Sequence, residues 1–184
     1  AITYVLGVPL GVLVTVTDGD VLNVSATSDP LLVCLGESAQ LDVAVRQIIA
    51  EDDFDAGIGT IWEQVSGGQA NAICGSVVGD ALRFNDAGTR VARTVPLDVS
   101  AGGALRFALK ICNGTAPCDD VDAGENIYVE YTINGSSWVI MATYTEAMFP
   151  DFSSVVLDIP LAAQTTATQF RWRQLLNSGV DQDN

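Results

Sequence analysis

Short runs in which apolar and polar residues alternate, separated by turn residues, fill this chain. In the first quarter they predict β-strands at 11–17, 21–26, 31–35 and 39–45. The dipeptide Asp18-Gly19 separates the first two runs, and Asp-Gly is a strong signal for a hairpin turn. We therefore expect residues 1–46 to form a small β segment of their own, either immunoglobulin-like or donating strands to another subunit.

The rest of the chain continues in the same way, with loops of Gly, Asp, Asn and Ser and no long window of helical period. The predicted strands are 58–65, 72–78, 81–84, 90–95, 105–111, 127–133, 138–144, 155–159 and 169–174. Many short strands at this spacing are typical of a sandwich or jelly roll. The predicted fold class is all-β, an antiparallel jelly-roll or β-sandwich domain over 47–184 preceded by the smaller segment.

Charge and composition restrict the function. The chain has 8 basic and 23 acidic residues, a net charge of -15 and no histidine. So few cations disfavour binding to nucleic acid or to anionic membranes. Without histidine, neither a Ser-His-Asp nor a Cys-His site can be built from this chain alone. Nothing in the sequence places two carboxylates in a pocket as a glycosidase pair, so we expect no enzyme.

The apolar run 2–16 is not expected to cross a membrane. It contains Gly7, Pro9 and Gly11, lacks a basic flank and is shorter than the roughly 20 residues of a spanning helix, so we expect neither a signal peptide nor membrane insertion. Because the chain starts without Met, we expect a piece of a longer precursor. Alternate residues of the run could pair with the sheet of another copy, although pairing within its own domain is the simpler alternative. These residues are Val8, Leu10, Val12, Val14 and Val16.

Four cysteines, Cys34, Cys74, Cys112 and Cys118, indicate disulfides rather than a metal or redox site. Their spacing gives no CxxC pair, and no histidine completes a zinc site. We expect disulfides formed in an oxidising compartment, with reduced thiols as the alternative. The favoured bond is Cys112–Cys118, and Cys34 is expected to pair with Cys74 or with a cysteine outside the chain.

Two acidic clusters are candidate calcium sites, because Ca²⁺ selects carboxylate oxygens. If the first and last strands are neighbours, the start and end of the domain converge on one group of carboxylates. That group comprises Glu51, Asp53 and Asp55, beside Asp52, together with Asp181 and Asp183. The second group comprises Asp119, Asp120, Asp122 and Glu125, without the EF-hand pattern. For both, a solvated acidic loop is the alternative.

The three tryptophans, Trp62, Trp138 and Trp172, are predicted to fill the sandwich core, with a sugar-stacking platform as the alternative. Arg171 and Arg173 flank Trp172, so strand alternation places the tryptophan on one face of the sheet and both arginines on the other. We expect those arginines to pair with carboxylates on the outer face.

An ordered series of motifs runs through residues 51–184. It includes Glu51-Asp52-Asp53-Phe54-Asp55, Trp62, Cys74-Gly75, Gly79 to Phe84, Gly88-x-Arg90, 105–111, Cys118, 129–138 and 170–174. The series resembles reelin-type subrepeats, which are jelly-roll modules of large extracellular proteins. Residues 30–43 resemble the opening strands of bacterial immunoglobulin-like modules.

The reelin resemblance implies a non-enzymatic extracellular module for adhesion or receptor contact, often with bound Ca²⁺. It also suggests Cys74–Cys118 as the rival disulfide. Members of the family continue into a closing strand after the point where this chain stops. We therefore expect the last strand to be missing and the sheet edge beside 170–176 to be open, to be filled by another chain or by the rest of the parent protein.

These observations together predict a structural or adhesion module of a larger cell-surface or secreted protein, as a building block of a bacterial filament, stalk or adhesin. Its expected partners are other copies of the protein or neighbouring domains of the parent chain. A carbohydrate-binding jelly roll appended to a secreted enzyme is one alternative. A ligand domain for a protein receptor is the other.

Overall fold

The computed structural model describes residues 21–29 and 40–174, except 86–89, 120 and 147. The chain divides into two compact units, Ala1–Ile49 and Ala50–Asn184, and each is described by itself.

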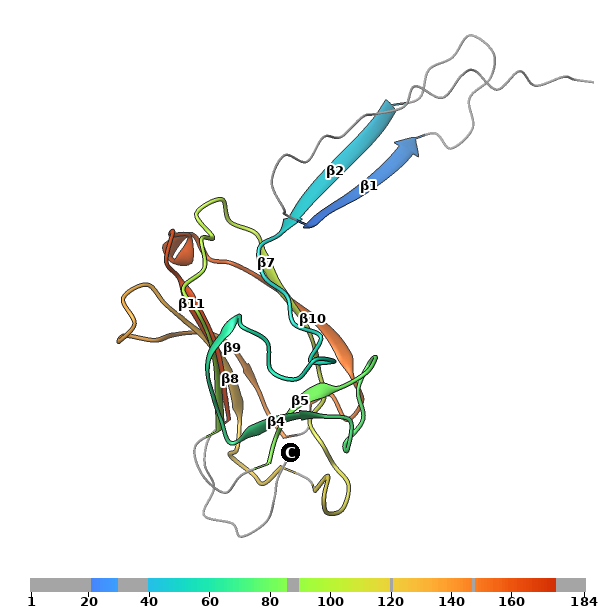
Figure 1. Cartoon of the computed structure of the whole chain (residues 1–184), viewed down its shortest axis with the longest axis vertical. Helices are drawn as coiled ribbons and strands as arrows, with labels where there is room; N and C mark the ends of the chain where they lie inside the picture. The colour runs from blue at the N-terminus through green and yellow to red at the C-terminus, as the bar shows by residue number, and fades with distance from the viewer. Residues whose placement is uncertain (1–20, 30–39, 86–89, 120, 147, 175–184) are drawn as a thin grey trace, which may run out of the picture. The chain divides into compact units, whose positions relative to one another are not determined.

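The first unit contains an antiparallel pair of strands, β1 (Val21–Asp29) and β2 (Gln40–Ile48), shown in blue and cyan in Figure 1. Val21 lies opposite Ile48, and the register continues to Asp29 opposite Gln40. The predicted strand 21–26 lies within β1. The predicted strand 39–45 lies within β2 except for its first residue, which is outside the described residues. The predicted strands 11–17 and 31–35, and the proposed pairing segment 8–16, lie outside the described residues.

The second unit is built on a five-stranded antiparallel sheet with the order β3-β6-β11-β8-β9. Its strands are β3 (Trp62–Ser66), β6 (Arg90–Thr94), β8 (Ile127–Thr132), β9 (Val139–Tyr144) and β11 (Gln169–Gln174). The last of these is central, because Trp172 lies opposite Ala92 of β6 on one side and Val129 of β8 on the other. The prediction of an open edge beside β11 is therefore wrong, and the outermost strands are β3 and β9.

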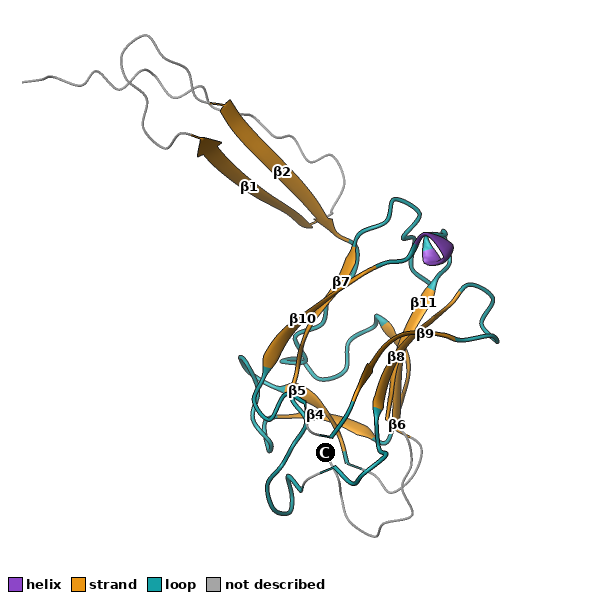
Figure 2. Ribbon diagram, turned by 180° about the vertical axis from the view of Figure 1, so that it is seen from behind, coloured by secondary structure: helices purple, strands orange, loops and turns teal. Residues whose placement is uncertain are grey.

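Two further strand pairs complete the unit: one faces this sheet, and the other runs across one end of the space between the two layers (Figure 2). One pairs β7 (Ala104–Leu109) with β10 (Ser153–Asp158), and the other pairs β4 (Gly68–Asn71) with β5 (Ala81–Phe84). The only other regular element in the described part of the unit is a 3₁₀ turn, η1 (Leu161–Ala163). The unit is thus an all-β sandwich with layers of unequal width, as the sequence predicted.

The core lies between these layers in two clusters. The first gathers Ile111, Val121, Ile127, Val129, Tyr144 and Val155, and the second gathers Val99, Tyr131, Ile159, Ala163 and Phe170. Val129 and Phe170 have no exposed surface. Burying a side chain of this size stabilises the fold by about 1.5–3 kcal/mol relative to its exposure, so alternate residues of β8 and β11 anchor the sandwich.

One predicted strand, 72–78, is wrong. The strand of this region is β4, which ends at Asn71, and residues 72–80 form the loop that joins it to β5. The Asn71 side chain accepts a hydrogen bond from the Ile73 N–H at 3.1 Å, and Gly75 has a φ of 90°, so the chain turns away from the ladder. The apolar side chains of this loop therefore do not enter the core.

Candidate functional site

The acidic segment, residues 51–55, is held in place by its own carboxylates. Asp52 accepts hydrogen bonds from the Trp62 indole N–H at 2.7 Å, the Gly59 N–H at 2.8 Å and the Phe54 N–H at 2.9 Å. The Phe54 ring stacks on Trp62 with 5.9 Å between centroids. A Cβ at position 59 would lie 2.8 Å from the Asp52 Oδ2 atom. Asp52 thus fixes the segment against the first strand of the sheet.

Asp55 connects the acidic segment to the loop at 72–80. Its Oδ1 atom accepts a hydrogen bond from the Asp80 N–H at 3.0 Å. Gly79 has a φ of 60°, and a Cβ there would lie 1.5 Å from the same oxygen. Asp53 makes a local contact, in which its Oδ1 atom accepts the Asp55 N–H at 3.1 Å. These carboxylates act as acceptors for backbone groups, a role that the sequence analysis did not foresee.

The predicted calcium sites do not come together within the described part of the chain, where no three Asp, Glu, Cys or His side chains are grouped as metal ligands. Asp181 and Asp183 of the first site, and Asp120 of the second, lie outside the described residues. Glu125 of the second site is only 2% exposed and lies 3.6 Å from the Arg90 guanidinium. Calcium at either position therefore stays a prediction.

The disulfide joins Cys74 to Cys118, with 5.5 Å between the two Cα atoms and 44 residues of sequence separation. The favoured pairing of Cys112 with Cys118 is therefore wrong, and the rival suggested by the reelin resemblance is right. Cys112 is a buried free thiol beside the core residue Ile111, so its sulfur points inward while Cys118 lies in the following loop. Cys34 lies outside the described residues, and Cys74 is no longer available to it.

Burial raises the pKa of the Cys112 thiol, although the positive charges of Lys110 and Arg83 act in the opposite direction. A buried thiol with a raised pKa has little of the thiolate form that reacts. Cys112 is therefore a core side chain and not a nucleophile.

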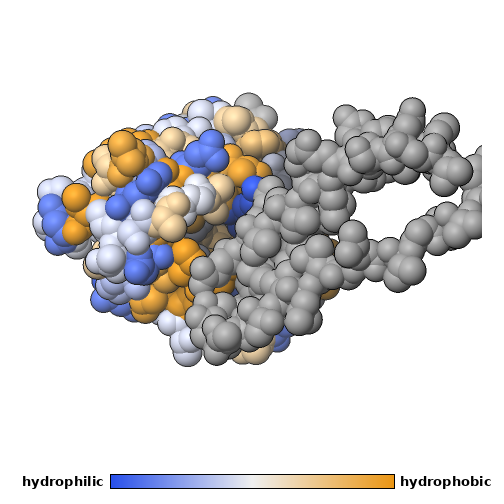
Figure 3. Space-filling model, turned by 90° about the horizontal axis from the view of Figure 1, so that it is seen from above, coloured by the Kyte–Doolittle hydropathy of each residue, from blue (hydrophilic) through white to orange (hydrophobic). Residues whose placement is uncertain are grey.

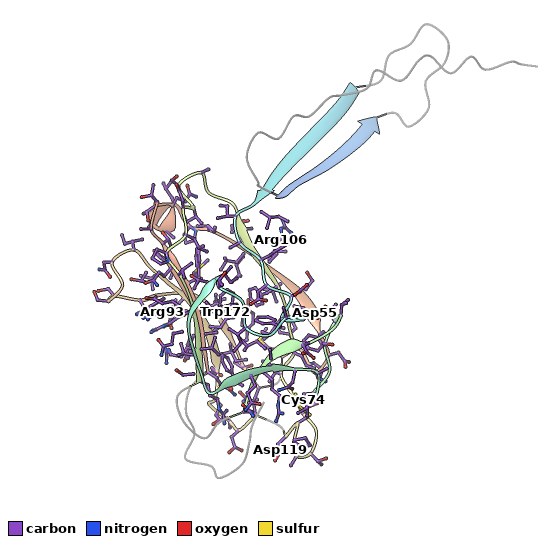
Figure 4. The ribbon with its side chains drawn as sticks, viewed as in Figure 1. Asp55, Cys74, Arg93, Arg106, Asp119 and Trp172 are labelled. Carbon is purple, nitrogen blue, oxygen red and sulfur yellow. A yellow bond between two sulfur atoms is a disulfide. The ribbon has the colours of Figure 1, made fainter. Side chains whose placement is uncertain are left out.

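The loop at 72–80, which we call the apolar loop, is both fixed and exposed. The disulfide ties it to the loop around Cys118, and the Lys110 ammonium group donates a hydrogen bond to the Cys74 carbonyl at 3.0 Å. Ile73, Val77 and Val78 are nevertheless 60%, 64% and 76% exposed. Figure 4 shows Cys74 at the end of the sandwich where Asp119 also lies.

The tryptophans do not form a platform. The Trp62 and Trp172 rings meet edge to face at 5.6 Å, and Trp172 meets Phe107 of the opposite layer at 5.4 Å. Both therefore pack toward the core, as predicted, and Figure 4 shows Trp172 between the layers. Trp138 differs, because the Arg171 guanidinium lies over its ring at 4.0 Å. One face of its ring is therefore covered by a cation.

The outer surface of the five-stranded sheet forms what we call the arginine face. Arg171 and Arg173 both bind Glu130, with nitrogen–oxygen distances of 2.6 Å and 3.1 Å, which confirms the expected pairing with an outer carboxylate. Arg173 also lies over the Tyr128 ring at 5.1 Å. Toward the β3 edge, the Arg93 guanidinium lies 3.2 Å from Glu63.

Glu130 is the centre of this arrangement, although its side chain is only 4% exposed. Burial raises its pKa, but hydrogen bonds from Arg173 and Arg171, together with their charges, outweigh burial and hold the pKa below the ordinary value. Sequence reasoning missed Glu130 itself, and the available signal was a single carboxylate at an alternating position of the strand 127–133. The arginine face is a closed network that stabilises the sheet.

Comparison with known protein families agrees with this architecture. The family model described as Reelin subrepeat B matches residues 67–184, well over half of the chain. The match spans β4 to β11 and includes both cysteines of the disulfide. Within the described ranges, no helix is long and apolar enough to cross a membrane.

Proposed function

This chain belongs to the Reelin subrepeat B family, and from that premise we propose that it is a stiff adhesion module in a cell-surface or secreted protein. The family is a non-enzymatic type of extracellular structural domain that forms part of a larger chain. A disulfide fits an oxidising compartment. The proposal adds that the module carries load and contacts other protein surfaces.

The observation that carries the proposal is the apolar loop, which combines exposure with fixed geometry. Three branched aliphatic side chains, Ile73, Val77 and Val78, face solvent on a loop anchored by a disulfide and by Lys110. Exposed apolar groups that are already ordered lose little conformational freedom when a partner covers them. Figure 3 shows hydrophobic residues also reaching the surface between hydrophilic ones on the drawn face.

The aromatic residues argue against the carbohydrate-binding alternative. Sugar-binding jelly rolls use exposed ring faces, whereas Trp62 and Trp172 pack toward the core and Arg171 covers one face of Trp138. The exposed apolar loop instead fits contact with protein. A receptor as the partner agrees with this loop equally well, and the proposal is therefore limited to a protein surface.

Single-molecule stretching of the full chain between two handles tests the load-bearing role. The oxidised chain should unfold at a higher force than the reduced chain, and it should extend less. The disulfide prevents a segment of 44 residues from extending. That segment corresponds to roughly 150 Å of extended chain at about 3.5 Å per residue. The matched control is the Cys112→Ala variant, which keeps the disulfide and should therefore show the same difference in extension between the oxidised and the reduced chain as wild type does.

Equal unfolding forces with and without the disulfide would contradict the load-bearing role. Binding of the same chain to immobilised polysaccharides, saturable and reversed by free sugar, would contradict the preference for a protein surface and support the carbohydrate-binding alternative.

A further inference from the structure

The two edges of the five-stranded sheet differ in how they are protected. An open edge offers unpaired backbone groups to other strands, and proteins commonly block it with charged residues. On one edge, β3 carries Glu63 followed by Gln64 and Ser66. On the other edge, β9 (Val139–Tyr144) has no charged residue, and among the described strands it pairs only with β8. Val139 and Ile140 are 49% and 51% exposed.

The charge of this sheet is opposite to that of the whole chain. Its five strands contain the four arginines 90, 93, 171 and 173 and the two glutamates 63 and 130, so the strands carry a net charge of +2. The whole chain carries -15. Two copies that approach through β9 therefore bring together two sheets whose strands hold no excess of carboxylates, and because β9 has no charged residue, no like charges lie opposite each other across the edge.

We propose that β9 pairs antiparallel with β9 of a second copy, joining two five-stranded sheets into one continuous sheet. An antiparallel edge pair is self-complementary under a two-fold axis, so it needs no foreign strand. A shift in register opposite Val129 and Glu130 interrupts β9, which limits the length of regular pairing. The contact is therefore weak and depends on concentration. This contact deepens the proposed adhesive role. It rests on that role in one respect only, because a weak contact forms when an assembly holds copies of the module close together.

Sedimentation of the full chain from micromolar to millimolar concentration tests this contact. The wild-type chain should shift from monomer to dimer as its concentration rises. Added salt should strengthen the dimer, because it screens repulsion between two strongly acidic chains.

The Val139→Lys and Ile140→Lys double variant should weaken the dimer by roughly tenfold or more, since lysine on an edge blocks strand pairing. The control variant is Ile58→Lys with Leu161→Lys, whose positions are 44% and 83% exposed and lie outside the strands. Both variants add the same charge, so only the position differs. Circular dichroism checks that each variant is folded.

Hydrogen exchange gives a second readout that does not depend on substitution. Backbone N–H groups of 139–144 should exchange more slowly at high protein concentration, while those of β3 should not change. A chain that stays monomeric throughout, or equal association of both double variants, overturns the proposal. Either result leaves the force measurement above untouched, so failure of this contact and failure of the proposed function are distinguishable.

Discussion

The acidic segment and the apolar loop have roles opposite to those that their composition suggests. Residues 51–55 carry the densest charge near the start of the domain, yet Asp52 and Asp55 accept hydrogen bonds from backbone and indole N–H groups. Residues 72–80 have the composition of a buried strand, yet Ile73, Val77 and Val78 face solvent. The polarity of these side chains therefore does not by itself predict their roles. Which backbone N–H groups need a hydrogen-bond partner decides what the carboxylates do.

Replacing both Cys74 and Cys118 by serine should cause the largest loss of stability. A bond that closes a loop of 44 residues stabilises by about 4 kcal/mol in the chain-entropy account. Urea denaturation should show that loss, and the apolar loop should become sensitive to protease. If stability is unchanged in the double variant, the disulfide does not fix the apolar loop.

The Asp52→Ala variant should cost about 3 kcal/mol, because it leaves the Trp62 indole and two backbone N–H groups without their acceptor. Asp53→Ala is the matched control in the same segment, since Asp53 makes one exposed local contact and its loss should cost less than about 0.5 kcal/mol. Thermal melts compare the two variants. Similar melting temperatures for both would mean that the segment is not fixed by Asp52.

Calcium tests whether the acidic segment has a second role. If the predicted site with Glu51, Asp53, Asp55, Asp181 and Asp183 exists, calcium at 100 times its dissociation constant should stabilise the chain by about 2.7 kcal/mol. Melting with calcium and with a chelator measures this directly. Coincident curves would remove the metal from the acidic segment and leave its structural role alone.

Acid should weaken the arginine face, because its central carboxylate is held ionised by two arginines. The pKa of Glu130 is lower in the folded protein than in the unfolded chain. Its contribution to stability is therefore complete above the unfolded value of about 4.3 and is lost as pH falls through the folded value. Thermal melts from pH 7 to pH 2 should show a smaller acid-induced decrease for Glu130→Gln than for wild type, and parallel curves would contradict the assignment.

The smallest effect on stability is expected for Ile73→Ser, Val77→Ser and Val78→Ser, each within about 0.5 kcal/mol because these side chains are mostly exposed. The matched comparison is Val129→Ser in the core, which should cost several times more. Urea denaturation of the four variants measures the difference. A large loss of stability at Val77 or Val78 would mean that the apolar loop packs against the fold rather than awaiting a partner.

Local patterns were enough to predict much of this fold. The strands at 81–84 and 169–174 have the predicted bounds, because alternation and flanking turn residues are local properties. The outward direction of Arg171 and Arg173 followed from the same alternation. The all-β sandwich needed no more than these signals.

Features that join distant residues were harder to predict. Asp52 reaches Trp62 only because the intervening residues turn back at Gly59. Cys118 meets Cys74 only because the apolar loop lies beside the loop after Cys112. In both cases the partner depends on how loops approach each other in three dimensions, which residue spacing does not report.

The central place of β11 has a consequence for how the protein is made. This strand, Gln169–Gln174, is the last one described along the chain, yet it separates the β3–β6 pair from the β8–β9 pair. During synthesis neither pair can join the other until the ribosome has released these residues. The sheet therefore closes late, through contacts between distant parts of the chain that form slowly, and a nascent chain that ends before Gln169 holds two halves without their common strand.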